Sequence, residues 1–284
     1  MVKHPSNFCG LAENDNNYEC ASVVIQPIPF DKTSTWIKGA DKGPAAIIEA
    51  SAYLELYDIE TESEVYKKGI FTAKPIKSAS SLEMIKKTDE RVSKYLRDNK
   101  LVVVLGGEHS VSVGVIKSYS RHYENLSVLH LDAHADSRSS YEGTPYNHAC
   151  VIARAREYTE NIVSVGIRSM DASESSGIHD GKMFFAHKIY DSDNWINDAV
   201  SQLTENVYIT IDLDVFDPAV MPSTGTPEPG GLSWYLVMKL LFAVSKSKKI
   251  AGFDVVELCP SSQKSPDFLA AKLVYTLLSY IYKV

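Results

Sequence analysis

Short apolar runs rich in β-branched residues alternate with longer stretches of helical period from Val23 to the end of the chain. This alternation is typical of strands joined by crossover helices in a parallel sheet. Several runs are apolar at every position, as a sheet covered by helices on both faces requires. The sequence therefore predicts an α/β fold of three layers, αβα, around a mainly parallel sheet. The expected strands are residues 23–28, 101–105, 126–131, 162–165, 183–186, 207–211 and 250–253.

The stretches between these runs carry the apolar period of amphipathic helices. The sequence shows no linker, internal repeat or low-complexity tract, so residues 21–284 are expected to form a single catalytic domain. Residues 1–20 are polar and irregular, and we expect them to form an N-terminal surface arm. The expected helices are residues 44–53, 81–97, 110–119, 148–158, 195–203, 234–245 and 266–282.

Residues 129–136, LHLDAHAD, carry the strongest functional signal. An apolar strand there ends in three potential metal ligands, and alternation along an extended segment places Asp132, His134 and Asp136 on one side. Ligands of open parallel sheets bind beyond the carboxyl ends of the strands. A strand end capped by polar residues would explain this segment equally well on its own.

Residues 207–214, VYITIDLD, repeat the arrangement, because an apolar strand ends with Asp212 and Asp214 on the same face. Two carboxylates at a buried strand end repel each other, and without a cation one of them would have to take up a proton. A metal ion removes that conflict. Asp217, which precedes Pro218, is expected to start a turn instead.

Residues 101–110, LVVVLGGEHS, form a third candidate strand end, where two glycines turn the chain and present His109 near a helix start. A Gly-Gly turn before a helix is common, so this segment is weak by itself. A parallel sheet, however, brings all three strand ends to one edge. The candidate metal ligands are His109, Asp132, His134, Asp136, Asp212 and Asp214.

Charge counting favours two metal ions over one. Four ionised aspartates balance two divalent cations, whereas one cation would leave two buried carboxylates uncompensated. Carboxylate and imidazole ligands favour Mn²⁺ over a thiolate-seeking ion, although Fe²⁺, Co²⁺ or Zn²⁺ fit the same ligands. Such ions lower the pKa of bound water to about 7, which indicates hydrolysis. Phosphate esters, amides and guanidines are all open as substrates at this point.

Three segments together resemble the signature of the arginase and agmatinase (ureohydrolase) family: GGEHS at 106–110, LDAHADSR at 131–138 and ITIDLDVFDPAVMPSTGTPEPGG at 209–231. The resemblance covers nearly the whole chain, since it extends to PFDKTS at 29–34, KGPAAI at 42–47, SVGIRS at 164–169 and GFDVVELCP at 252–260. It implies an arginase-like sheet of about eight strands, two Mn²⁺ ions as cofactors, and a homotrimer or homohexamer.

The resemblance also implies roles for individual residues. It gives His109 and Asp136 to one ion and His134 to the other, with the remaining three aspartates completing and bridging the pair. His148 matches a loop histidine near the substrate, and Glu257 matches the carboxylate that pairs with a guanidinium. The structural alternatives are a histidine satisfied by backbone at a helix start and a surface or helix-capping acid.

The implied reaction is the hydrolysis of a guanidinium group to urea. A hydroxide bridging the ions would add to the guanidinium carbon, while the metals and Asp136 stabilise the tetrahedral intermediate. His148 would protonate the departing amine. Glu257 would hold the planar guanidinium by two parallel charge-assisted hydrogen bonds.

The loop at 137–147, SRSSYEGTPYN, resembles the Arg-containing, YEG-type loop of agmatinases rather than the arginase loop that satisfies an α-carboxylate and an α-amino group. Agmatine, cleaved to putrescine and urea, is therefore the expected substrate. The alternatives are other ureohydrolase activities: arginase, guanidinobutyrase or formiminoglutamase. Arg138 would suit the carboxylate of such substrates, but an ion pair with a neighbouring acid is the interpretation we favour. Glu108 and Cys259, where many relatives carry Asp and Asn, are not ligands.

Composition narrows the classes of partner. Lys and Arg number 29 against 36 Asp and Glu, a net charge of -7, so a basic face for nucleic acid or anionic lipid is not expected, and a small cationic substrate suits the chain better. A binuclear phosphoesterase conflicts with Glu257, which would repel phosphate. The complete set of six candidate ligands also speaks against a scaffold that has lost its activity, because buried acids with no metal to bind would lower its stability.

Four widely spaced cysteines form no C-x-x-C pair, so reduced structural thiols are expected. No stretch approaches the roughly 20 apolar residues that span a bilayer, and we expect a cytoplasmic protein. Some aromatic residues lack motif support: the histidines at 4, 122, 130, 179 and 187 are expected to be structural or exposed, and the tryptophans at 36, 195 and 234 to lie in the core or an interface.

Overall fold

The computed structural model describes residues 6–175 and 181–283. Eight strands form one sheet in the order β2-β1-β3-β8-β7-β4-β5-β6, and every neighbouring pair in it is parallel. The sheet of about eight parallel strands is therefore confirmed. The strands are β1 (Val23–Ile28), β2 (Ile70–Thr72), β3 (Leu101–Gly106), β4 (Ser127–Leu131), β5 (Ile162–Ile167), β6 (Met183–Phe185), β7 (Asn206–Asp212) and β8 (Lys249–Val256).

Helices connect the strands, and local sequence fixes where several of them begin. Ser80 caps α2 by accepting the backbone N–H of Glu83, and Ser233 caps α7 in the same way. The α-helices are α1 (Gly43–Ser51), α2 (Ser81–Arg97), α3 (Ser112–His122), α4 (Val151–Ala155), α5 (Ala186–Ile189), α6 (Trp195–Ser201), α7 (Trp234–Ser247) and α8 (Ser265–Lys283). The short 3-10 helices are η1 (Phe8–Gly10), η2 (Ala40–Lys42), η3 (Val65–Lys68), η4 (His109–Val111), η5 (His148–Cys150) and η7 (Leu213–Val215).

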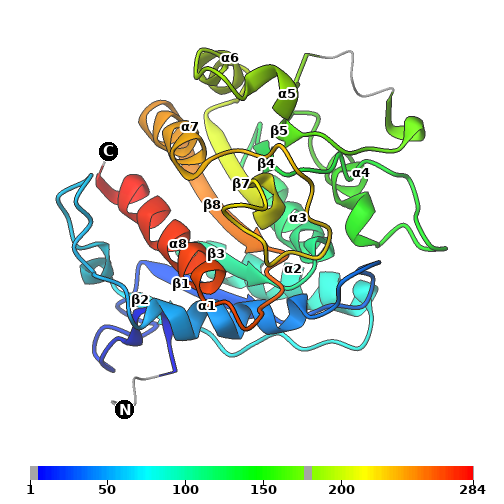
Figure 1. The fold of residues 1–284 in the computed structure, drawn as a ribbon. Helices are drawn as coiled ribbons and strands as arrows, with labels where there is room; N and C mark the ends of the chain where they lie inside the picture. The colour runs from blue at the N-terminus through cyan, green and yellow to red at the C-terminus, as the bar shows by residue number, and fades with distance from the viewer. Residues whose placement is uncertain (1–5, 176–180, 284) are drawn as a thin grey trace.

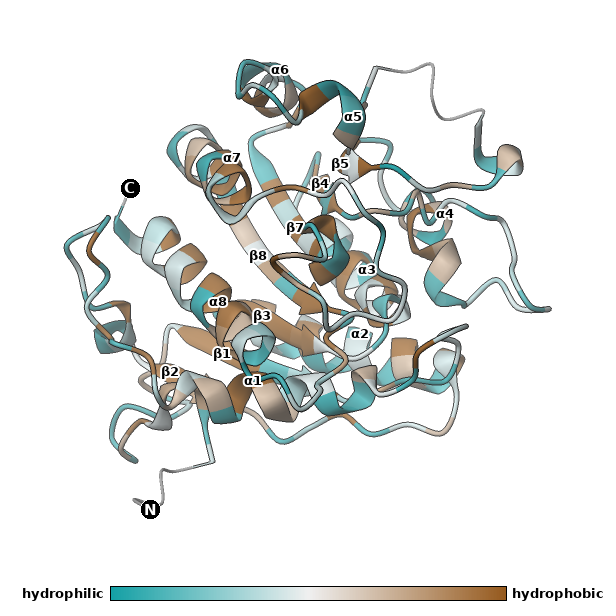
Figure 2. Ribbon diagram, viewed as in Figure 1, coloured by the Kyte–Doolittle hydropathy of each residue, from teal (hydrophilic) through white to brown (hydrophobic). Residues whose placement is uncertain are grey.

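The helices cover both faces of the sheet (Figure 1). In β3, Val103 and Leu105 pack into a core with α1, α6, α7 and α8, whereas Val102 and Val104 pack into a second core with α2, α3 and α4. Figure 2 shows the central strands as largely hydrophobic and much of the outer helix surface as hydrophilic. This is the three-layer αβα arrangement that runs apolar on both faces predict.

Strand register brings the carboxyl ends of the four central strands to one level. Leu105 in β3 pairs with Val255 in β8, Val255 pairs with Ile211 in β7, and Ile211 pairs with Leu131 in β4. The chain therefore leaves these four strands at the same edge of the sheet. The residues that follow each strand within a few positions are placed side by side.

One expected helix is shorter than predicted, and one strand was not predicted. The helix expected at 148–158 begins as η5 and ends as α4 at Ala155, where a turn takes over: the backbone N–H groups of Tyr158 and Thr159 both donate to Ala155 O. The strand β2 comes from a run of three residues, Ile70–Thr72, that was not singled out in the sequence.

The segment at residues 7–11 does not match the surface arm expected for residues 1–20. Phe8, Cys9 and Leu11 are buried in the core. The backbone N–H of Phe8 donates to Thr72 Oγ1 over 2.9 Å, and that of Cys9 donates to Ser51 Oγ over 2.7 Å. These contacts attach the segment to β2 and α1, so the expectation is wrong for residues 7–11.

The four cysteines, Cys9, Cys20, Cys150 and Cys259, are free thiols, as expected. Among the described residues, no helix is long and apolar enough to cross a membrane. His4 and His179 lie outside the described residues.

Candidate active site

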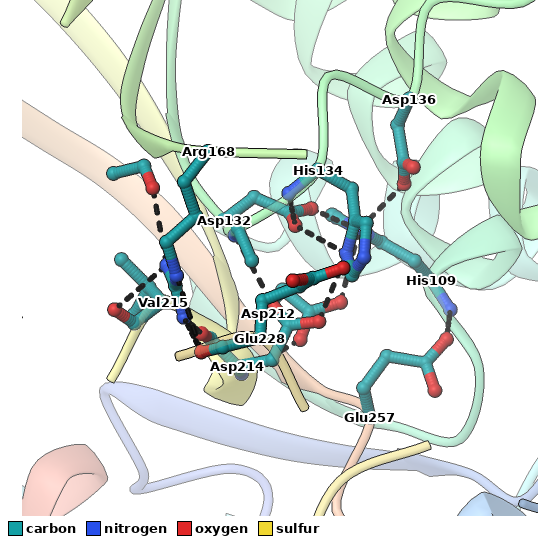
Figure 3. A network of polar contacts seen from close by, with 12 residues as sticks. His109, Asp132, His134, Asp136, Arg168, Asp212, Asp214, Val215, Glu228 and Glu257 are labelled. Carbon is teal, nitrogen blue, oxygen red and sulfur yellow. Dashed lines mark hydrogen bonds and ion pairs between the residues drawn. The ribbon is translucent and has the colours of Figure 1, made fainter. Parts of the chain in front are cut away.

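Six side chains converge beyond the carboxyl ends of β3, β4 and β7 (Figure 3). Each of these residues lies at the carboxyl end of its strand or within a few residues after it. All but one are almost fully buried, and the side chain of His134 is 25% exposed. They are the residues that the sequence predicts as metal ligands: His109, Asp132, His134, Asp136, Asp212 and Asp214.

The imidazole of His109 faces three carboxylates at once. Its Nδ1 lies 3.0 Å from Asp132 Oδ2, 3.2 Å from Asp136 Oδ2 and 3.4 Å from Asp212 Oδ2. This buried nitrogen has no hydrogen-bond partner among the described residues. Atoms that each bind one ion at about 2.1 Å lie about 3 Å apart, so this spacing fits a shared cation.

The other nitrogen of His109 is fixed by a buried chain of hydroxyls. Its Nε2 lies 2.8 Å from Thr210 Oγ1, which donates its single hydrogen to Asp254 Oδ1 over 2.7 Å. Tyr208 in turn donates to Asp254 Oδ2 over 2.6 Å. Thr210 must therefore accept from the Nε2–H of His109, and this leaves the Nδ1 lone pair directed at the carboxylates. Such an orientation is what metal ligation by histidine requires.

Asp132 joins this group to a second one. Its Oδ1 lies 3.5 Å from the Nδ1 of His134, which is also 3.0 Å from Asp214 Oδ2. Asp132, His134 and Asp214 have ligand atoms close enough to share one ion, as do His109, Asp132 and Asp136. Asp132 therefore belongs to both groups, and its two oxygens face different histidines.

Protons accumulate in this cluster when no metal balances its charge. Burial and the carboxylates of Asp214 and Asp132 raise the pKa of Asp212 well above its usual range. Burial alone would lower the pKa of His109, but the carboxylates of Asp132, Asp136 and Asp212 raise it well above its usual value. A divalent cation would take the place of these protons. The donors and their charge thus fit a pair of divalent ions.

His130 adds a contact that the sequence reading missed. Its Nε2 lies 2.8 Å from Asp132 Oδ2, and its Nδ1 lies 3.1 Å from Ser164 Oγ. A histidine held between a hydroxyl and a carboxylate orients that carboxylate. His130 has the same parity in the strand as Asp132 and His134, so alternation alone could have indicated it.

Glu257 lies beside the cluster at the end of β8. Its backbone N–H donates to Gly107 O over 2.8 Å, and its Oε1 accepts the backbone N–H of His109 over 2.7 Å. Burial and the carboxylate of Glu108 raise the pKa of Glu257 well above its usual range. Glu257 and Asp136 both have positive φ angles, 65° and 48°, which are uncommon for residues other than glycine. Backbone strain of this kind gathers at functional sites.

A cavity of about 220 Å³ opens over these carboxylates. His148 and Glu257 line it together with His109 and Asp136. Trp36 also lines the cavity and is 69% exposed, so of the two expected places the core is excluded, and an interface stays a prediction. The cavity thus combines the candidate metal cluster with both residues predicted to contact the substrate.

The cation at the cavity wall, Arg138, is already paired. Its Nε lies 3.5 Å from Glu174 Oε2, and its guanidinium lies over the ring of Tyr141, 4.4 Å from the centroid. Glu174 also accepts the backbone N–H groups of Ser137 and Asp171. The ion pair favoured from the sequence is therefore confirmed.

Arg168 was not singled out by the sequence reading, although it follows β5 directly. Its guanidinium donates only to backbone carbonyls, which come from three segments of the chain (Figure 3). Its Nη2 donates to Asp214 O over 2.6 Å and to Glu228 O over 2.8 Å. The loop ahead of Glu228 begins at Asp217, which accepts the N–H groups of Ala219, Gly230 and Gly231 and so starts a turn as expected. Arg168 fixes the backbone that carries Asp214.

The structure thus brings together the six candidate ligands and places His148 and Glu257 on the same cavity. Their roles as ligands and substrate contacts stay predictions. The sequence analysis missed the contacts of His130, which alternation could have indicated, and those of Arg168, whose partners lie in distant segments.

Comparison with known sequences identifies a family and individual proteins that are similar to this chain. The sequence model of the Arginase family matches residues 21–279. The N(1)-aminopropylagmatine ureohydrolase of Synechocystis sp. is 36% identical over 281 residues, which cover 95% of this chain and 92% of that protein. The agmatinase of Pyrococcus horikoshii is 35% identical over 263 residues, 91% of each chain.

Comparison with solved structures gives a similar result. The crystal structure of agmatine ureohydrolase of Thermoplasma volcanium superposes with a TM-score of 0.88 at 31% identity, and the match covers 99% of this chain and 96% of that one.

Proposed function

Because this chain belongs to the arginase family and is a ureohydrolase, we propose that it cleaves the guanidinium group of agmatine, giving putrescine and urea. One observation carries the proposal: a shared carboxylate, Asp132, stands between His109 and His134, and Glu257 is bonded to the backbone of His109. A site for two cations therefore adjoins a buried acid that suits a guanidinium.

The family depends on a binuclear metal centre. We propose that His109, Asp132 and Asp136 hold one ion, that Asp132, His134 and Asp214 hold the other, and that Asp212 completes the centre. Mn²⁺ is the proposed metal, since carboxylate and imidazole donors suit it. When bound, the ions would supply an activated water for hydrolysis.

The protein's own residues bind and orient the substrate. The Glu257 carboxylate would accept two parallel hydrogen bonds from the planar guanidinium. Burial makes this acid costly to ionise alone, so a cationic partner gains affinity from its charge. Asp136 lies at the same wall and would stabilise the tetrahedral intermediate, in which the leaving nitrogen becomes positively charged as it takes up a proton.

We propose that His148 donates a proton to the departing amine. It lines the same cavity as Glu257, and an imidazole ring can both take up and release a proton. Without such a donor the amine would leave as an anion, which is far less favourable.

The state of Arg138 supports agmatine over guanidino acids. Its Nε is paired with Glu174 and its guanidinium lies over Tyr141, so an acid of the protein already offsets the charge that a substrate carboxylate would need. Arginine, 4-guanidinobutyrate and formiminoglutamate each carry such a carboxylate. Agmatine carries an ammonium group instead, which suits the net charge of the chain.

N(1)-aminopropylagmatine is the second candidate substrate. The relative from Synechocystis sp. carries its name, and this molecule also lacks a carboxylate. Its guanidinium end would use the same contacts as agmatine. The two candidates differ only in the tail that leaves the cavity.

A urea-release assay decides among these substrates. The purified chain loaded with Mn²⁺ is given agmatine, N(1)-aminopropylagmatine, arginine, 4-guanidinobutyrate and formiminoglutamate, and kcat/KM is compared. We expect agmatine to give the highest value. A higher value for N(1)-aminopropylagmatine would replace the substrate within the same proposal, whereas preference for a guanidino acid would refute it.

Two further proposals accompany this function. The match of the family sequence model to residues 21–279 supports residues 21–284 as a single catalytic domain. A homotrimer or homohexamer is the proposed assembly, which light scattering of the purified chain would measure.

A further inference from the structure

One hydroxyl holds both the main chain and the ring of His148. The backbone N–H of His148 donates to Thr33 Oγ1 over 2.9 Å, and Nδ1 of the ring lies 3.3 Å from the same oxygen. Thr33 belongs to the loop after β1, 115 residues earlier in the chain. The orientation of His148 therefore depends on a segment outside its own loop.

Glu108 in turn fixes Thr33. The hydroxyl of Thr33 donates to Glu108 Oε1 over 2.6 Å. The backbone N–H groups of Lys32 and Thr33 donate to Oε2 over 2.6 and 2.5 Å, and Ser110 Oγ donates to Oε1 over 2.6 Å. Glu108 is fully buried, so these four donors have no competition from solvent.

The direction of these hydrogen bonds sets the tautomer of His148. A hydroxyl has one hydrogen, and Thr33 gives it to Glu108. Towards His148 it can only accept, so Nδ1 must carry the hydrogen. Nε2, on the opposite edge of the ring, is then the nitrogen that takes up and releases a proton. Because Nδ1–H is present in both the neutral and the charged ring, the contact survives the proton transfer.

We propose that Thr33 and Glu108 are positioning residues that hold the His148 ring in its Nδ1–H form, with Nε2 free to serve the leaving amine. The inference rests on the proposed function, in which His148 is the proton donor. Neither positioning residue has a proposed contact with the substrate.

A purely structural role for the pair makes a different prediction. Glu108 also anchors the loop through the backbone N–H groups of Lys32 and Thr33. Thr33→Val removes the hydroxyl and keeps those backbone bonds, so it separates the two roles. Thr33→Ser keeps the hydroxyl and should restore function.

The first experiment measures kcat and KM for urea release by Mn²⁺-loaded variants. We expect Thr33→Val to lower kcat on the order of tenfold to a hundredfold with little change in KM, because a misoriented general acid loses its contribution. Thr33→Ser should recover most of the loss. Thr61→Val is the matched control, since the Thr61 hydroxyl also donates to a buried carboxylate, that of Asp58, but does not line the cavity.

The second experiment places Thr33→Val in a His148→Ala background. If Thr33 acts through His148, the double variant has the kcat of His148→Ala alone, since effects of residues that act as a unit do not add. Losses that multiply would show an independent role and overturn the inference. Equal loss of kcat in Thr33→Val and Thr61→Val would overturn it as well.

Glu108→Gln provides an isosteric test of the tautomer. With the amide oxygen kept by the two backbone N–H groups, its NH₂ group faces the Thr33 hydroxyl, which must then donate towards Nδ1 of His148. We expect a fall in kcat comparable to that of Thr33→Val with metal content unchanged. Full kcat in this variant would contradict the inference. The proposed function fails separately, if the unaltered chain releases no urea or if His148→Ala keeps full kcat.

Discussion

The backbone N–H of His109 donates to Oε1 of Glu257 over 2.7 Å. One hydrogen bond thus joins a proposed metal ligand to the acid proposed to bind the guanidinium. The Glu257 carboxylate is thus held by the backbone of His109, which is more rigid than a second side chain would be. A substitution can therefore test the proposed metal ligands and the proposed substrate contact separately only if it keeps this hydrogen bond.

Glu257→Gln is such a substitution, because its amide oxygen can still accept from His109. It removes the negative charge, and hydrogen bonds to charged groups contribute about 1.5–3 kcal/mol. We expect kcat/KM for agmatine to fall about tenfold to a hundredfold while metal content stays that of the unaltered chain. Steady-state kinetics with metal analysis measures both. Unchanged kcat/KM would remove Glu257 from the substrate site.

Replacement of a proposed ligand should remove metal and activity together. His109→Ala and Asp212→Ala are expected to lose bound metal and urea release, because each leaves a centre with too few donors and unbalanced charge. Asp217→Asn, a change in the turn just after Asp214, is the control and should keep its metal. Retention of full activity by a metal-free His109→Ala/Asp212→Ala protein would contradict the binuclear mechanism.

Metal binding should release protons. Burial alone would lower the pKa of His134, but the carboxylates of Asp214 and Asp132 raise it to about 12 in the chain without metal. A histidine must be neutral to bind a metal, so the ion displaces this proton and apparent affinity rises with pH. Calorimetric titration in buffers of different ionisation enthalpy measures the release. A binding enthalpy independent of the buffer would contradict it.

The same group gives the metal-free fold a pH dependence. A pKa raised from 6.5 to about 12 on folding contributes stability that is fully present below 6.5 and is lost as pH rises towards 12. The gain in Tm on adding Mn²⁺ should therefore be larger at about pH 8.5 than at about pH 6. Differential scanning calorimetry with and without metal tests this, and a gain that shrinks with pH would have the wrong sign.

Arg168→Lys should destabilise the chain by about 2 to 4 kcal/mol, because an ammonium cannot reach carbonyls that a guanidinium joins and each orphaned carbonyl is costly. We expect weaker metal binding as well, since Arg168 fixes the backbone of Asp214. Chemical denaturation and metal titration measure the two effects. Arg91→Lys, at an exposed position of α2, is the control. Equal stability of the two variants would show that the network around Arg168 is dispensable.

Gly107→Ala should disrupt the site from its backbone. A Cβ at Gly107 would lie 2.0 Å from Phe30 O, so the segment that carries Glu108 and His109 must move. We expect a loss of about 3 kcal/mol in the free energy of unfolding and weaker metal binding. Gly181→Ala, where no atom of the described residues lies within 4 Å, should cost about 1 kcal/mol for its positive φ. Similar losses in both variants would contradict the close approach.

Seven of the eight strands were predicted from sequence, because a buried parallel strand needs an apolar run that is visible without knowing its neighbours. The six candidate ligands were found for a related reason: alternation puts Asp132 and Asp136 on one side, and parallel pairing brings Asp212 beside them. These predictions use only the alternation of side chains along each strand and the rule that the carboxyl ends of parallel strands lie at one edge of the sheet.

The residues that were missed act through partners that local patterns do not reveal. Arg168 binds backbone carbonyls, which have no signature in the sequence. Thr33 reaches His148 from another loop, and the approach of the two loops depends on the whole fold. The burial of Phe8 depends on packing that the local sequence does not reveal.

Asp136 and Glu257 occupy backbone that glycine would adopt with less strain, by about 1 kcal/mol each. Selection for heat resistance alone would therefore favour glycine at both positions, and if both acids have their proposed roles, the resulting protein would have lost its activity. Thermostable descendants of this chain that keep both acids must gain their stability elsewhere in the molecule.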